Sequence, residues 1–199
     1  MRRFNISILV ATLGILIPSL GCQAQVSNAE QQIGGAVSAA PADLRDGATV
    51  LGYADDGTLV TIREGTNDLT CLADNPTDDR FHAACYHNSL EPYMKRGREL
   101  RAEGITGQES LRMRHEEADA DKLEMPSAPA AVYNLSGSLD IFDPETGTVT
   151  GGSPFYAVYI PYATAESTGL PTSAGPGVPW IMRPGTASAH IMIIPPKNE

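Results

Sequence analysis

The stretch that decides the fold is LTCLADNPTDDRFHAACYHNSLEPYMKRGRELRAEG, residues 69–104. Its first half predicts two short strands, over 69–73 and 81–87, which are joined by a polar loop. From Asn88 or Ser89 onward the apolar residues recur at helical spacing, so a helix is predicted after the second strand. A chain that passes from strands to a helix in this way is typical of the α+β class.

Further strands are predicted on the N-terminal side of this stretch. Residues 48–53 and 58–63 are rich in β-prone residues, and Asp55-Asp56-Gly57 between them is a strong turn signal. Together with the strand over 69–73, these two strands predict an antiparallel meander over 48–73.

A second helix and more strands are predicted on the C-terminal side. Thr106-Gly107-Gln108-Glu109 reads as a capping box that begins a polar helix ending near Leu123. The strands expected after it cover residues 131–135, 155–162, 181–182 and 190–194. The expected fold is therefore α+β, in one domain over 45–199. Its antiparallel sheet is built from an N-terminal meander and C-terminal strands, with two central helices.

The N-terminal segment MRRFNISILVATLGILIPSLGCQAQ, residues 1–25, predicts export from the cytosol. Arg2 and Arg3 precede an apolar run over 6–17, and Pro18 closes that run. This is the layout of a secretory signal. The run is shorter than the roughly 20 apolar residues that span a membrane.

Two cleavage routes fit this segment, and they predict different locations. Cleavage after Ala24 would remove residues 1–24 and leave a periplasmic protein. Ser19-Leu20-Gly21-Cys22 also resembles the lipobox of bacterial lipoproteins, in which the signal would be residues 1–21 and Cys22 would carry a lipid anchor. Gly21 and Cys22 fit that pattern, whereas Ser19 and Leu20 do not.

The residues after the signal are small and polar. Residues 25–44 read QVSNAEQQIGGAVSAAPADL, which offers few large apolar groups to bury. Such a composition predicts a flexible tether between the N-terminus and the folded domain.

The charge of the chain limits its partners. The chain has 24 Asp and Glu residues and 14 Lys and Arg residues, so its net charge is −10. A general nucleic-acid binder is excluded because phosphate contacts need a basic surface. Attraction to an anionic membrane is excluded for the same reason, so a membrane contact is expected only through a lipid at Cys22.

Cys71 and Cys85 are predicted to form a disulfide, because they lie on neighbouring strands of an exported protein. His82 and His87 flank Cys85, so a zinc or copper site is the alternative. The spacing matches no standard zinc module, and strand alternation places His82 on the face opposite to Cys85 and His87. A disulfide flanked by two histidines is the favoured interpretation, and no metal or cofactor is expected.

Aromatic residues offer a second candidate for binding. Tyr156 and Tyr159 lie on one predicted strand, and Trp180 follows a Gly/Pro-rich loop over 169–179. Aromatic side chains bind sugars and peptides, but they also fill the cores of sheets. Core packing is the favoured interpretation, with a binding surface at this strand and loop as the alternative.

Three blocks of the chain resemble exported bacterial proteins to which no activity is assigned. They are CYHNSLEPYMKRGRELRAEG at 85–104, PYATAESTGLPT at 161–172 and PWIMRPGTASAHIMI at 179–193. The resemblance implies a single exported domain, and it carries no functional residue over to this chain.

The chain lacks the common hydrolase and nucleotide-binding motifs, among them G-x-S-x-G, H-E-x-x-H and the P-loop. We therefore predict a non-enzymatic, exported binding or accessory domain that contacts a protein or glycan of the cell envelope. One alternative is a small envelope hydrolase that uses His87 or His190 with an acid. The other is a metal-binding protein built on His82 and His87.

Overall fold

The computed structural model describes residues 27–175 and 177–196, which include four α-helices and ten strands. The helices are α1 (Ala29–Val37), α2 (Glu91–Ala102), α3 (Gly107–Asp119) and α4 (Ala165–Thr168), and the short turns of 3-10 helix are η1 (Ala42–Leu44), η2 (Asn88–Leu90) and η3 (Leu139–Ile141). The strands are β1 (Thr49–Tyr53), β2 (Leu59–Arg63), β3 (Leu69–Leu72), β4 (Phe81–His87), β5 (Ala130–Gly137), β6 (Phe142–Asp143), β7 (Thr148–Val149), β8 (Ser153–Tyr159), β9 (Trp180–Met182) and β10 (His190–Ile193). The expected signal, residues 1–24, and the lipidation candidate Cys22 lie outside the described residues.

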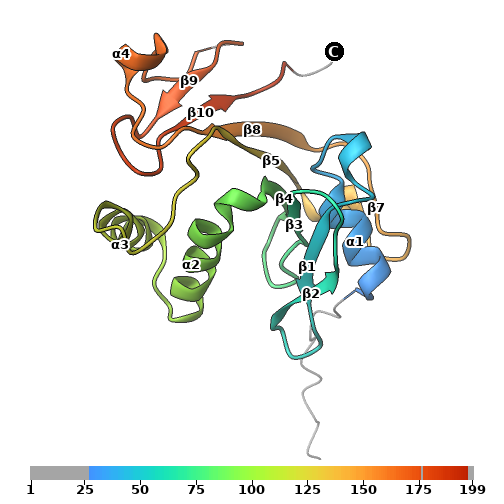
Figure 1. Ribbon diagram of the computed structural model, residues 1–199. Helices are drawn as coiled ribbons and strands as arrows, with labels where there is room; N and C mark the ends of the chain where they lie inside the picture. Colours follow the sequence, from blue (N-terminus) through green and yellow to red (C-terminus); the bar gives the residue numbers. More distant parts are fainter. Residues whose placement is uncertain (1–26, 176, 197–199) are drawn as a thin grey trace, which may run out of the picture.

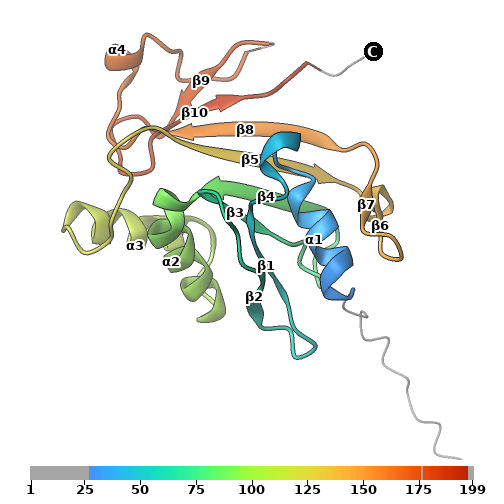
Figure 2. The same ribbon diagram turned by 45° about the vertical axis from the view of Figure 1, so that its right-hand side comes forward.

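The strands form one eight-stranded sheet in the order β2-β1-β3-β4-β5-β8-β10-β9, and β6 pairs with β7 in a separate small hairpin (Figure 1). The α+β class predicted from the sequence is confirmed. Helices cover both faces of the sheet, because α1 and the α2–α3 pair lie on opposite sides of the central strands (Figure 2).

The N-terminal strands do not form the predicted meander, and the sheet is not purely antiparallel. β1 pairs antiparallel with β2 but parallel with β3, so that Thr49 lies opposite Thr70. The cause is the loop after β2, which crosses the start of β1 and places β3 on the other side. In this loop the Thr66 N–H donates to the Gly47 carbonyl over 2.7 Å. A Cβ on Gly65 would lie 2.3 Å from the Thr49 nitrogen, so glycine permits the crossing.

The predicted tether, residues 25–44, is also corrected by the structure over residues 29–44. Asn28 and Gln31 form a capping box that begins α1, and η1 follows within the same segment. Ala36 is fully buried and Ala40 is 3% exposed, because both pack against the core. The segment is therefore a structural element of the fold.

The small residues that suggested a tether are what allow α1 to pack closely. A Cβ on Gly34 would lie 2.5 Å from the carbonyl oxygen of Gly147, which belongs to the β6–β7 hairpin. A Cβ on Gly35 would lie 3.0 Å from the ring of Phe142. The helix is buried through these close glycine contacts together with the packing of Ile33 and Val37 on the core, and composition alone does not reveal it.

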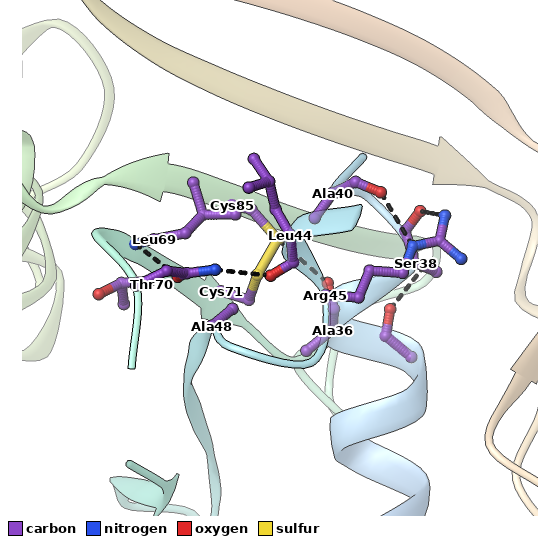
Figure 3. Close-up of a disulfide and its surroundings, with 12 residues drawn as sticks. Ala36, Ser38, Ala40, Leu44, Arg45, Ala48, Leu69, Thr70, Cys71 and Cys85 are labelled. Carbon is purple, nitrogen blue, oxygen red and sulfur yellow. Dashed lines mark hydrogen bonds between the residues drawn. A yellow bond between two sulfur atoms is a disulfide. The ribbon is translucent and has the colours of Figure 1, made fainter. Parts of the chain in front are cut away.

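The predicted disulfide between Cys71 and Cys85 lies at the centre of the core under α1. The two cysteines are direct partners on β3 and β4, with their Cα atoms 4.0 Å apart, and both are fully buried. The Sγ atom of Cys85 lies 3.4 Å from the carbonyl oxygen of Ala36. Figure 3 shows Ala36, Leu44 and Ala48 around the sulfur–sulfur bond. The disulfide therefore joins β3 to β4 directly beneath α1.

The close packing of α1 predicts effects of different size for two glycine-to-alanine substitutions in helices. In G34A the new Cβ meets backbone that cannot move away, so we expect a loss of about 2 kcal/mol in the free energy of unfolding. In the control G97A the Cβ meets only the flexible end of Arg114, and alanine favours the helix, so the change should stay within about 1 kcal/mol. Urea unfolding measures both values. A gain in stability for G34A would contradict the packed position of α1.

Removal of the disulfide should cost a large part of the stability. The bridge closes a segment with a sequence separation of 14 residues, for which the chain-entropy estimate is about 3 kcal/mol. We expect the double variant Cys71→Ala, Cys85→Ala to lose about that amount in urea unfolding. The wild-type protein unfolded under reducing conditions is the control, and a loss below about 1 kcal/mol in both cases would argue against a structural role for the bridge.

Candidate functional site

A cavity of about 230 Å³ lies beside the N-terminal half of α1. Three segments far apart in the sequence enclose it: α1, the loop between β3 and β4, and the connection from β5 to the β6–β7 hairpin. Its lining residues are Ser27, Gln32, Gly35, Ala73, Asp74, Pro76, Asp78, Phe81, Leu139, Phe142 and Pro144. Most of these side chains are apolar, so the cavity offers an apolar interior with a few polar groups.

The walls follow from the local structure of each segment. Gly35 has no side chain, so the ring of Phe142 comes close to α1 at the edge of the cavity. The rings of Phe81 and Phe142 stack with their centroids 5.5 Å apart and form an aromatic wall. A wider, open groove of about 950 Å³ shares Ser27, Gln32 and Pro144 with the cavity. The cavity therefore opens toward the N-terminal end of α1.

Gln32 forms a fixed part of the lining that the cavity and the groove share. Its side-chain NH₂ donates to the carbonyl oxygens of Ser27 and Tyr53, and its side-chain oxygen accepts from the Tyr53 N–H over 2.7 Å. The side chain thus pairs with the backbone of β1 as a neighbouring strand would. A Cβ on Gly52 would lie 2.7 Å from that oxygen, so the contact requires glycine there. Gln32 is only 8% exposed, which makes it a rigid part of the site.

Asp74 is the electrostatically unusual group of the cavity. Burial first, and the negative charge of Asp78 to a lesser extent, raise the pKa of Asp74 to about 6. The His82 N–H donates to its Oδ1 atom over 2.8 Å, which opposes the shift only in part. Within the described chain, neither Asp74 nor Asp78 forms an ion pair. Asp74 is a partly desolvated carboxylate that lacks a counter-ion.

The groove extends the negative character of the cavity. Asp55 and Glu145 line it, on the β1–β2 turn and on the β6–β7 hairpin respectively. No Lys, Arg or His is among the described residues that line either the cavity or the groove. The whole cleft therefore repels anions and is complementary to cations.

His82 and His87, which the alternative of a zinc or copper site would use, do not come together. The Nε2 atom of His82 lies 3.3 Å from the side-chain oxygen of Asn134, and burial lowers the pKa of His82. His87 lies on the opposite face of β4, where its Nδ1 accepts from the Ser89 N–H at the start of η2. The disulfide removes the Cys85 thiolate, and no group of three metal-ligating side chains is found in the part of the chain that the structure describes.

His190, proposed for the hydrolase alternative, is part of a buried network. Its Nδ1 atom lies 2.7 Å from the carbonyl oxygen of Ser188, and burial lowers its pKa. The Nε2 atom of His115, on α3, lies 2.6 Å from the hydroxyl oxygen of the same serine. A serine beside a histidine is the start of a nucleophilic site, but Ser188 is fully buried. A substrate does not reach it, so the network connects α3 to the C-terminal strands.

The aromatic residues do not gather into the single surface that the alternative to core packing would need. Tyr156 and Tyr159 point to opposite faces of β8. Tyr159 stacks on His190 with centroids 4.9 Å apart, and burial raises its pKa to about 12. Trp180 is 8% exposed. Only Tyr156 reaches a shallow groove, where it packs edge-on against Tyr133.

The residues that build the cavity were not among those singled out from the sequence. Gln32 lies in the segment expected to be a tether, and Asp74 and Asp78 lie in a loop that was described only as polar. The one local signal for this site was the run of acidic residues over 74–79. Their partner Phe142 is more than sixty residues away, and no local pattern connects them.

Comparison of the chain with protein-family models, curated proteins and solved structures gave no match. The resemblance to exported bacterial proteins therefore stays a prediction. Among the described helices, none is both long and apolar enough to cross a membrane. The functional argument depends on the geometry of the cleft itself.

The raised pKa of Asp74 predicts a pH-dependent stability difference between the wild type and D74N. Its folded-state pKa of about 6 exceeds the usual value of 3.8, so the folded state binds the proton more tightly, and stability falls as the pH rises from 4 to 6. Asparagine keeps the acceptor for the His82 N–H without the charge. A shift of this size is about 3 kcal/mol for a fully buried group, and for this half-exposed one we expect about 1 kcal/mol.

Urea unfolding of both proteins between pH 4 and pH 8 measures this effect. D74N should gain about 1 kcal/mol relative to the wild type as the pH rises from 4 to 7, with no further gain above pH 7. The titration of the Asp74 side-chain carbon by NMR is the direct control. A difference in stability that is constant with pH would contradict the assignment.

Proposed function

We propose that the protein is an exported, non-enzymatic binding domain of the cell envelope, and that its binding site is the cleft beside α1. The observation that carries this proposal is the apolar cavity with two carboxylates that lack counter-ions. Such a cavity, with few convergent polar groups and a perturbed pKa, is the usual form of a ligand site.

The composition of the cavity favours binding over catalysis. Its polar side chains are Ser27, Gln32, Asp74 and Asp78, and both ends of the Gln32 amide are occupied by backbone groups. No histidine, cysteine or basic side chain lines it among the described residues, so a nucleophile with an adjacent strong base is lacking there. Apolar walls with fixed polar groups are suited to hold a partner's side chain.

The predicted export of the protein supports an envelope partner. The first 24 residues have the layout of a secretory signal, and the Cys71–Cys85 disulfide is of a kind that persists in oxidising compartments. The fully buried bridge is adjacent to the cavity through Ala73 and Asp74, which directly follow β3. An exported protein partner, rather than a cytosolic one, is therefore proposed.

Site-specific photo-crosslinking in living cells tests this proposal. A photo-reactive amino acid is placed either at Leu139, which lines the cavity and is 52% exposed, or at Val178, which is 49% exposed and does not line it. We expect one predominant protein adduct from position 139 and none from position 178. The cavity-filling substitution Ala73→Leu should remove the adduct, while urea unfolding shows that the variant remains folded. Equal adducts from both positions, or an adduct that survives the folded A73L variant, would overturn the proposal.

A further inference from the structure

We infer that the cavity beside α1 receives one basic side chain, lysine or arginine, from an extended polypeptide segment of the partner. This inference rests on the proposed function, because it names the group that the same cleft would bind. Three properties of the described cleft support it: the size of the cavity, the charge of its lining, and the groove into which it opens.

The size and the walls of the cavity suit a single long side chain. Its volume of about 230 Å³ is below the roughly 300–1,000 Å³ that is usual for complete small-molecule ligands. Phe81, Phe142 and Leu139 offer apolar contacts along its length. Lysine and arginine carry an apolar stem that packs on such walls while the charged group reaches a polar end.

The charges of the cavity select a cation at that polar end. Asp74 accepts one hydrogen bond from the backbone of His82, and Asp78 accepts one from the side chain of Asn75. Besides burial, Arg101 near the end of α2 contributes to lowering the pKa of His82, but among the described residues this arginine forms no ion pair with Asp74 or Asp78. A bound ammonium or guanidinium would supply the counter-ion that the two carboxylates lack, and a guanidinium can donate two parallel N–H groups to one carboxylate.

A free metal ion is a poorer match to the same carboxylates. No set of three ligating side chains occurs in the described chain, and the walls beside Asp74 are apolar. Hard cations require several oxygen ligands, and this cavity does not bring them together. The chemistry therefore favours an organic cation with an apolar stem.

The adjoining groove indicates that the cation belongs to a polypeptide rather than to a small amine. The groove is continuous with the cavity through Ser27, Gln32 and Pro144, and it passes along β2, the edge strand of the sheet. Val60 on this strand is 40% exposed and lines the groove. At about 950 Å³ the groove has room for several residues of extended chain, whose side chains would pack on Val60 and Ile62 of β2.

The test uses the purified protein with its disulfide intact and five matched peptides, Ac-Ala-Leu-Xaa-Leu-Ala-NH₂. Xaa is arginine, lysine, citrulline, norleucine or glutamate, and citrulline is the uncharged isostere of arginine. Backbone-amide NMR titrations at low salt give the affinity and the place of binding. We expect the arginine and lysine peptides to shift the amides of Ala73, Asp74 and Phe81, and to bind at least tenfold more tightly than the citrulline peptide.

Two aspartate variants show whether the carboxylate of the cavity causes this preference. D74N should lower the affinity for the arginine peptide about tenfold and leave the affinity for the citrulline peptide unchanged. The control D121N makes the same change in net charge at an exposed residue after α3, and it should leave both affinities unchanged. An equal loss in D121N would overturn the inference, because the preference would then come from net charge.

The remaining outcomes separate this inference from the proposed function. If all five peptides bind equally at the cavity, or if the glutamate peptide binds more tightly, the cavity does not select a basic side chain and the inference is wrong. The crosslink at position 139 then still tests whether the cavity is the binding site. If n-butylguanidine binds as tightly as the arginine peptide, the ligand is a small organic cation and not a polypeptide segment, and the inference is wrong. If no peptide shifts the amides of the cavity, the inference is wrong. The proposed function is then tested only by whether the A73L substitution removes the crosslink.

Discussion

The close packing of α1 on the disulfide-bridged strands β3 and β4 is the contact on which the rest of the structure depends. The bridge holds β3 and β4 in register, and the Ala36 carbonyl lies against the Cys85 sulfur. Gly34 and Gly35 let the helix approach the β6–β7 hairpin and Phe142 at the same time. Because the cavity lies between these elements, its shape is fixed by the same contacts that complete the core.

The negative charge of Asp74 in this cavity is not required by the fold. The hydrogen bond from the His82 N–H to Asp74 requires only an oxygen acceptor, which asparagine would supply equally well. The carboxylate adds a desolvated charge, and its raised pKa shows that the folded state is less stable for it at neutral pH. Natural proteins accept such costs mainly where function requires the group. This is the physical reason to place function at Asp74 rather than at the histidines.

Much of the fold could be predicted from local patterns, and the errors have a common origin. The strand over 81–87 and the turn at Asp55-Asp56-Gly57 were predicted and are present in the structure, and two cysteines on neighbouring strands of a chain with a predicted export signal indicated the bridge. α1 was missed because the residues at helical spacing that pack on the core, Ile33, Ala36 and Val37, stand among glycines and alanines, whose composition indicated a tether. The parallel β1–β3 pair was missed because it depends on a loop that crosses a strand at Gly65, and glycine there also fits an ordinary turn.

The candidate site was harder to predict because it consists of three segments that meet only in space. Residues with notable chemistry, such as His82 and His190, turned out to have hydrogen-bond partners that account for them. Gln32, Asp74 and Phe142 have ordinary chemistry, and they gain importance only from their position around one cavity. A sequence reveals residue types, whereas a binding site of this kind is defined by desolvation and enclosure.

The distribution of charge over the molecule gives the cleft a further property. On α2 and α3, the arginines Arg96, Arg98 and Arg112 pair with glutamates of the same helices, so that much of the charge there is neutralised. On the α1 side, the four acids of the cleft have no cation among the residues that line it. A basic segment is therefore attracted to the cleft from a distance before it makes any contact. Electrostatic attraction would set the rate of encounter, and the apolar cavity would set how long the partner remains bound.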